Sequence, residues 1–154
     1  LYEVYDSLVS NVTFYNSNVY VNTTSSLQVF DSIGNLYYEK MVYGNQLVDT
    51  VTINENLIFA YIPYSEYSTN SSTLRVLSLN GLDVFILFPS RVNNIALSSK
   101  YIYCFAKDCI YLYNYKGEYV DSISLEFDIT GFNKISSNFL VIKSEDDSYL
   151  FYLD

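Results

Sequence analysis

The segment "NSNVYVN" (Asn16–Asn22) joins a polar turn to a short apolar strand, and three later segments repeat this pattern. They are "NENLIFA" from Asn54, "SSKYIYC" from Ser98 and "SSNFLVI" from Ser136, so the four starts are 38, 44 and 38 residues apart. A polar turn followed by β-branched, aromatic and aliphatic residues predicts a β-hairpin. A period near 40 residues, built from strand signals alone, predicts a repeated all-β unit.

A second motif recurs in phase with the first. Gly34, Gly81 and Gly117 each lie seven residues after an aliphatic residue that starts a strand, in "LQVFDSIG", "LRVLSLNG" and "IYLYNYKG". Glycine at one fixed offset predicts equivalent tight turns with positive φ. The C-terminal "YLFYLD" resembles the same strand without its turn.

Short strands also precede and follow these two motifs, which completes a unit of four antiparallel strands, A to D. The A strands are "VTF", "VTI", "IAL" and "GFN", and the D strands are "LYYEKMV", "LDVFILF" and "EYVDSISL". We expect "LYEVYD" at the N-terminus to supply the last D strand by pairing with "SYLFYLD", because both would otherwise be exposed edges. The predicted units are residues 9–43, 47–88, 92–125, and 127–154 together with 1–6.

These repeats resemble the β-propeller superfamily, of the divergent WD40-like, YVTN or quinoprotein-like kind, along essentially the whole chain. The resemblance implies a single domain of about four four-stranded blades, with the N-terminal strand closing the last blade. A fragment or half of a larger propeller is the alternative. WD40 signature pairs and the paired arginines of phosphoinositide-binding propellers are absent, since the chain has no Trp and no His and since Arg75 and Arg91 stand alone. The resemblance therefore implies a fold and carries over no site residues.

Composition excludes several classes of function. The 154 residues carry 8 Lys and Arg against 17 Asp and Glu, which gives a net charge of −9. Such a surface repels phosphate backbones and anionic lipids, so we expect no nucleic-acid partner and no membrane insertion. Without histidine, Ser-His-Asp and Cys-His catalysis are excluded. We expect no enzyme and no cofactor, with carboxylate-based catalysis as an unfavoured third hypothesis.

The B–C connections are the candidate binding site. In an A-B-C-D unit they lie on one face together with the D–A connections, and loops on a rigid scaffold commonly bind partners. We expect this face to bind a protein or a glycan; the alternative is a structural piece of a larger assembly, such as a coat or surface layer, or a homo-oligomer. The candidate residues are Tyr64, Glu66, Tyr67, Asn70, Lys107, Asp108, Glu145, Asp146 and Asp147.

Polar residues near the A strands are candidates for lining a central channel. They are Asp49, Asn93, Asn94 and Asp128. The three consecutive acids at 145–147 would splay apart in a hairpin turn and lack calcium-loop spacing, so we expect no metal site.

Cys104 and Cys109 flank "FAKD", and they would form a disulfide if they were the closing pair of that hairpin. Two buried thiols are the alternative. Sequons at Asn11, Asn22 and Asn70 predict possible glycosylation. Together with the abundance of Ser, Thr and Asn, they slightly favour an extracytoplasmic or cell-surface location over an intracellular one.

Overall fold

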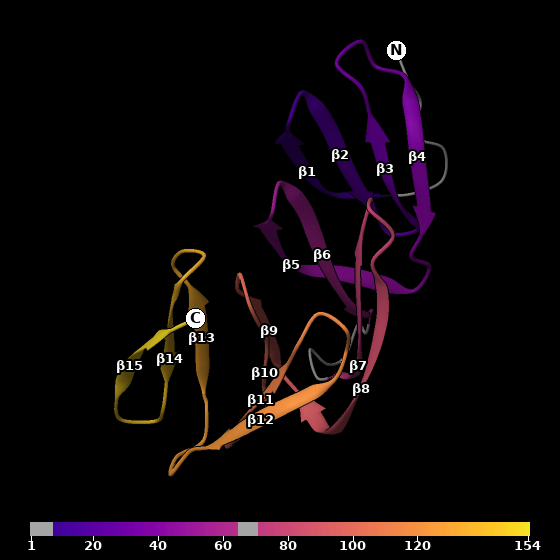
Figure 1. Ribbon diagram of the computed structural model, residues 1–154. Coiled ribbons are helices and arrows are strands. Elements are labelled where there is room, and N and C mark those ends of the chain that lie inside the picture. Colours follow the sequence, from indigo (N-terminus) through magenta and orange to yellow (C-terminus); the bar gives the residue numbers. More distant parts are fainter. Residues whose placement is uncertain (1–7, 65–70) are drawn as a thin grey trace.

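The computed structural model describes residues 8–64 and 71–154 and contains four antiparallel sheets (Figure 1). The first holds β1 (Val9–Tyr15), β2 (Asn18–Thr23), β3 (Ser26–Phe30) and β4 (Leu36–Met41). The second holds β5 (Asn45–Ile53), β6 (Asn56–Pro63), β7 (Ser71–Ser78) and β8 (Asp83–Val92). The third holds β9 (Asn94–Leu97), β10 (Ile102–Phe105), β11 (Cys109–Tyr113) and β12 (Tyr119–Ser124). The fourth holds β13 (Gly131–Lys134), β14 (Phe139–Lys143) and β15 (Ser148–Tyr152).

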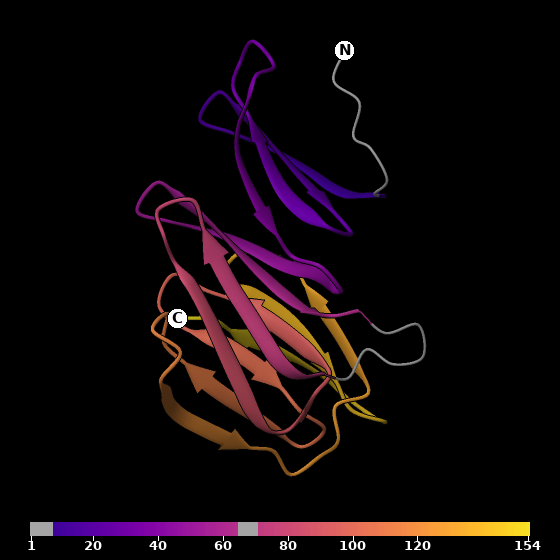
Figure 2. The same cartoon turned by 90° about the vertical axis from the view of Figure 1, so that its right-hand side faces the viewer.

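Each sheet keeps its strands in sequence order, which confirms the predicted all-β repeat. The first three sheets contain A, B, C and D strands, and the fourth contains A, B and C strands within the described residues. The sheets, called blades 1 to 4 below, follow one another along an arc whose concave side is lined by the A strands β1, β5, β9 and β13 (Figures 1 and 2). Blades 1 and 4 lie at the two ends of this arc, so the described residues do not form a closed four-blade ring. Pairing of residues 1–6 with β15 lies outside the described residues and stays a prediction.

Apolar side chains fill the space between every two consecutive blades. Leu27 and Val29 of blade 1 pack in one cluster with Phe59 and Leu77 of blade 2. The blade 2–3 cluster includes Leu74, Val76, Ile102 and Cys104, and the blade 3–4 cluster includes Phe105, Ile110, Leu140 and Ile142. Because blades 2 and 3 are covered on both faces, their B strands are continuous apolar runs without alternation.

The C–D turns are equivalent, as the glycine spacing predicts. Gly34, Gly81 and Gly117 have φ values of 90°, 97° and 82°. Asp31 and Asn114 hold two of these turns in the same way: the side-chain Oδ1 accepts hydrogen bonds from the backbone N–H groups two and four residues later, at 3.0 and 2.8 Å for Asp31 and at 2.9 and 3.1 Å for Asn114. The side chain before each turn therefore reinforces the conformation that glycine permits.

The four A–B turns all form hairpins, as predicted, but they are of two kinds. Residues 16–17 and 54–55 have consecutive positive φ values, as two-residue type I′ hairpins require. In the other two turns a serine hydroxyl accepts hydrogen bonds from the N–H groups two and three residues later, at 3.2 and 3.0 Å for Ser98 and at 3.3 and 3.2 Å for Ser136. A polar turn residue can thus act through its backbone or through its side chain.

An ionic cluster crosses the outer part of the junction between blades 1 and 2. Lys40 of β4 lies 2.8 Å from Asp83 of β8. Arg75 of β7 holds the same carboxylate in a two-point contact at 2.9 and 3.0 Å, and it donates to the Met41 carbonyl of blade 1 at 2.8 Å. The hydrogen bond from Arg75, with help from Lys40, lowers the pKa of Asp83 from 3.8 to about 2.

Gly117→Ala tests whether this turn is limited by packing as well as by φ. A Cβ at Gly117 would lie 2.6 Å from Val84 Cγ1, whereas one at Gly34 would meet nothing within 4 Å. Positive φ alone costs about 1–2 kcal/mol and overpacking adds about 1–3. We expect Gly117→Ala to lower the unfolding free energy by about 3 kcal/mol in urea titrations and Gly34→Ala by about 1. Val84→Ala should recover part of the Gly117→Ala loss; equal losses at both glycines would contradict this.

The Asp83 cluster predicts an acid-sensitive junction. A carboxylate whose pKa falls from 3.8 to about 2 on folding stabilises the fold above pH 3.8, and this contribution disappears as the pH falls through 2. Because the pair is partly exposed, we expect its contribution to be about 1 kcal/mol. In urea titrations, the difference in stability between the wild-type chain and Asp83→Asn should shrink by that amount between pH 5 and pH 2. A difference independent of pH would contradict the assignment.

Candidate functional site

The B–C turns and D–A connections lie on one face of the arc, as predicted, and hydrogen bonds join them directly. Val42 N–H donates to the Ser25 carbonyl at 2.8 Å, and Tyr64 N–H donates to the Gly44 carbonyl at 2.7 Å. Each bond links a B–C connection to a D–A connection. We call this surface the B–C face, made of residues 24–25, 42–44, 64, 93, 106–108, 125–130 and 144–147.

In blade 3, the B–C turn is fastened to the connection that leads into blade 4. The carbonyls of Lys107 and Asp108 accept hydrogen bonds from Ile129 N–H at 2.6 Å and Leu125 N–H at 2.8 Å. The Lys107 ammonium lies 2.7 Å from Asp128 Oδ2, and this hydrogen bond raises the pKa of Lys107. Asp128 therefore belongs to the B–C face, and its expected place in the central channel is wrong.

In blade 4, the B–C turn presents three acids to solvent. Ser144 closes the turn, since its N–H donates to the Asp147 carbonyl at 2.9 Å and its Oγ accepts from Asp147 N–H at 3.0 Å. Glu145, Asp146 and Asp147 are all exposed on this short turn. Thr130 of the neighbouring connection donates its hydroxyl to the Ser144 carbonyl at 2.8 Å, so the turn has a fixed position beside blade 3.

Together, residues 106–108, 125–130 and 144–147 form an acidic end of the B–C face. Sequence reasoning missed Glu126 and Phe127, although "EFD" directly follows the third D strand. The Phe127 ring stacks on Tyr149, with centroids 4.4 Å apart and planes 8° from parallel. The acidic end carries six carboxylates and one lysine: Asp108, Glu126, Asp128, Glu145, Asp146, Asp147 and Lys107.

The blade 2 loop contributes only Tyr64 to the described surface. Tyr64 follows β6 and is 58% exposed. Glu66, Tyr67 and Asn70 lie outside the described residues, so their predicted role in binding, and the sequon at Asn70, stay predictions.

The concave side contains a second polar group, centred on Asp49. Asp49 of β5 accepts a hydrogen bond from the Leu97 N–H of β9 at 2.7 Å and forms an ion pair with Lys134 of β13. Lys134 also donates to the Leu97 carbonyl at 3.0 Å. Both side chains are mostly buried, with 14% of Asp49 and 19% of Lys134 exposed. Sequence reasoning missed Lys134; the one available signal was a lone cation at the end of a predicted A strand.

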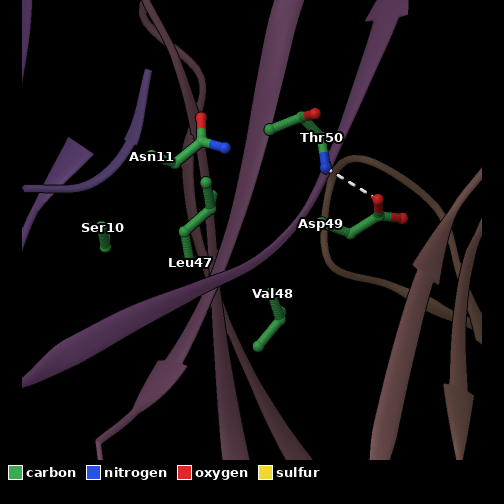
Figure 3. Close-up of a pocket in the computed structure, with 6 residues that line it drawn as sticks. All are labelled: Ser10, Asn11, Leu47, Val48, Asp49 and Thr50. Atoms are coloured by element: carbon green, nitrogen blue, oxygen red, sulfur yellow. Dashed lines mark hydrogen bonds between the residues drawn. The ribbon is translucent and has the colours of Figure 1, made fainter. Parts of the chain in front are cut away.

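Shallow cavities border this group. One of about 300 Å³ lies between β1 and β5 and is lined by Ser10, Asn11 and residues 47–50, with the Thr50 N–H donating to Asp49 (Figure 3). Asn93 and Asn94 line a separate cavity of about 280 Å³. Asp49 and the two asparagines therefore line different cavities, and Asp128 lies on the B–C face. No three His, Cys, Asp or Glu side chains gather as a metal site in the described part of the chain.

Both thiols are free, so of the two alternatives for Cys104 and Cys109 the structure has the one without a disulfide. The hairpin closes at Ala106, whose N–H donates a hydrogen bond to the Cys109 carbonyl at 2.8 Å. Cys104 instead lies opposite Tyr111 of β11. The two cysteines are therefore not opposite one another. Burial between blades 2 and 3 raises the pKa of Cys104, which keeps it protonated.

The sequon at Asn22 is not a glycosylation site in this fold. Asn22 is fully buried, and its side-chain oxygen accepts a hydrogen bond from the Tyr61 hydroxyl of blade 2. A glycan would have to break the packing between blades 1 and 2. Asn11 is exposed on β1, so the prediction at that position remains open.

The Asp49–Lys134 pair predicts strong coupling between blades 2 and 4. Asp49→Asn leaves a mostly buried ammonium without its carboxylate and should lower the unfolding free energy by about 2–3 kcal/mol. Lys134→Met should lower the unfolding free energy by about 1–2 kcal/mol, and the double variant should lower it by less than the sum of the two single losses. Urea titrations of this cycle measure the coupling. Lys107→Met, which breaks an exposed pair, is the control and should leave stability unchanged; additive losses at 49 and 134 would contradict the coupling.

Comparison with known proteins places this geometry in a known fold. No protein-family model matches the chain, and no curated protein sequence matches it. Among solved structures, BBS1N in complex with ARL6DN is 12% identical with a TM-score of 0.64, and the alignment covers 95% of this chain and 52% of that one. Kluyveromyces marxianus Hsv2 is 15% identical with a TM-score of 0.59, and the alignment covers 96% of this chain and 49% of that one.

BamB from Moraxella catarrhalis is 16% identical with a TM-score of 0.54, and the alignment covers 91% of this chain and 41% of that one. The chain thus spans about half the length of the structures it matches. The described residues include no helix that could cross a membrane. The blade repeats and these likenesses together show that the chain has the β-propeller fold.

Proposed function

We propose that this chain is a non-catalytic protein-binding module whose B–C face, at blades 3 and 4, binds a basic segment of a partner protein. The observation that carries the proposal is the acidic end of that face, where six carboxylates stand on three connections with a single lysine among them. A negative surface of this kind attracts Lys and Arg side chains and speeds their association.

The local structure suits recognition because the acidic turns are held in place. Backbone hydrogen bonds fasten residues 107 and 108 to the following connection, and Thr130 ties that connection to Ser144. A partner would therefore meet an ordered surface and lose little entropy on ordering it. The stacked pair of Phe127 and Tyr149 adds an aromatic surface nearby, on which the aliphatic part of a lysine or arginine side chain packs well.

The solved structures support the class of partner in general terms. BBS1N, a propeller of the same fold, was crystallised in complex with another protein, ARL6DN. At 12% identity this supports the use of the fold for protein binding and identifies no partner for this chain.

Binding to an array of Lys- and Arg-rich 12-residue peptides tests the proposal. The full chain should bind a subset of these peptides at physiological salt. A higher salt concentration should weaken the binding of every peptide in that subset. The double variant Glu145→Gln/Asp146→Asn should lose about 10-fold in affinity for that subset, because two close charge contacts are worth about 1.4 kcal/mol or more together.

A matched control separates the acidic end from net charge. Glu55→Gln/Asp121→Asn also removes two carboxylates, one from an A–B turn and one from β12, and it should retain the wild-type affinities. If both double variants lost the same affinity, the binding would depend on net charge and not on the acidic end. Retention of uncharged glycans on a glycan array, without binding of any basic peptide, would overturn the proposal.

A further inference from the structure

Strand β8 is the outer edge of blade 2, and one side of it has no partner strand (Figure 1). The sheet runs in the order β5, β6, β7, β8, and within the described residues only β7 pairs with β8. Ser78 N–H donates to the Leu82 carbonyl at 2.9 Å just before β8 begins, which sets the pattern of bonds to β7. In an antiparallel pair alternate residues bond to the partner strand, so the backbone groups of Phe85 and Leu87 point outward from the free edge.

The side chains of Phe85 and Leu87 form an apolar strip on the blade 1 side of this edge. Phe85 lies opposite Arg75, whose guanidinium carbon is 5.0 Å from the centroid of the Phe85 ring, and Leu87 lies opposite Thr73. Phe85 is 68% exposed and Leu87 is 75% exposed, so blade 1 leaves both side chains uncovered. An apolar edge strand with unpaired backbone groups is a template for a further strand.

An aromatic groove lies on the other side of the same edge, between β8 and blade 3. It has a volume of about 560 Å³ and is lined by residues 87–89 of β8 together with Tyr111, Tyr113, Gly117 and Tyr119 of blade 3. The Phe88 ring is 6.0 Å from the Tyr113 ring, and the Tyr113 ring is 5.9 Å from the Tyr119 ring, measured between centroids. The lining has no charged side chain, and Lys116 and Glu118 on either side of Gly117 carry opposite charges. Both walls of the groove belong to blades that have a neighbour on each side.

Both ends of β8 are positively charged, although the whole chain has a net charge of −9. At the start of the strand, Arg75 and Lys40 both pair with the single carboxylate of Asp83, which leaves one positive charge. Near its end, Arg91 is exposed and forms no ion pair with any described residue. The β8 edge therefore has an apolar centre between two positive ends.

We propose that the β8 edge binds an extended segment of a partner protein, which adds a fifth strand to blade 2. The backbone of this segment bonds to the outward N–H and C=O groups of Phe85 and Leu87. Successive side chains of a strand point to opposite faces. One set therefore fills the groove beside Tyr113 and Tyr119, and the other set covers the exposed side chains of Phe85 and Leu87.

The charges of the edge define the composition of the segment. Its centre is apolar or aromatic, and its two ends are acidic, where they meet the Asp83 cluster and Arg91. Pro89 has no N–H to donate, so strand pairing ends before it. This segment is opposite in charge to the basic segment proposed for the B–C face, so the two surfaces select different sequences.

Synthetic peptides of about nine residues, the length of a long strand, test the proposal. They carry Val, Ile or Tyr at the central positions and Asp or Glu at both ends, and fluorescence polarisation measures their binding to the full chain. A subset should bind, and replacing its terminal acids by Asn and Gln should weaken binding by about 5-fold. N-methylation of the backbone at one set of alternate residues should abolish binding, and N-methylation at the other set should leave it unchanged, because only one edge of the peptide bonds to β8.

Variants of the chain locate the site. Leu87→Asp should weaken binding by at least about 10-fold, because the added strand would cover an unpaired carboxylate. Ile33→Asp is the matched control, since Ile33 is 82% exposed on a turn of blade 1 and the change in net charge is the same; it should retain the wild-type affinity. Arg91→Gln should weaken the binding of the acidic-ended peptides by about 3-fold and leave that of the Asn- and Gln-ended peptides unchanged. Far-UV circular dichroism of each variant should remain that of the folded chain.

Four outcomes would overturn the proposal. If no acidic-ended peptide bound at about 1 mM, the edge would accept no such strand. Equal effects of both sets of N-methyl groups would mean that the peptide lies in the groove without strand pairing. Equal losses in Leu87→Asp and Ile33→Asp would mean that net charge alone sets the affinity. A wild-type homodimer that Leu87→Asp dissociates would place a second copy of this chain on the edge.

The two binding proposals can fail separately. Leu87→Asp should leave the affinity for the basic peptides unchanged, and Glu145→Gln/Asp146→Asn should not weaken the binding of the acidic-ended peptides.

Discussion

A small β-sheet with two apolar faces is stable only when a neighbour covers each face, and the organisation of this molecule follows from that constraint. Burial of an aliphatic or aromatic side chain contributes about 1.5–3 kcal/mol, so the three clusters between consecutive blades are the main source of stability. They also explain why β6 is almost entirely buried although it lies in a sheet of only four strands.

Charged side chains restrict the angles between blades, which apolar packing alone would leave variable. Apolar contacts are non-directional and would tolerate a range of angles between blades. The Asp83 cluster joins blades 1 and 2 near their outer strands, and the Asp49–Lys134 pair joins blades 2 and 4 across β9 on the concave side. One group therefore acts at the periphery and the other near the axis.

The repeat was predictable from sequence because its cause is local. Gly34, Gly81 and Gly117 satisfy a backbone requirement within four residues of the turn, and apolar runs indicate strands without reference to partners. Features that depend on distant residues were not predictable. Lys134 is buried through its ion pair with Asp49, which is 85 positions away in the sequence. Asn22 is buried because blade 2 covers it. The sequence left open whether Cys104 and Cys109 form a disulfide, and they do not meet because the hairpin closes at Ala106, two residues after Cys104.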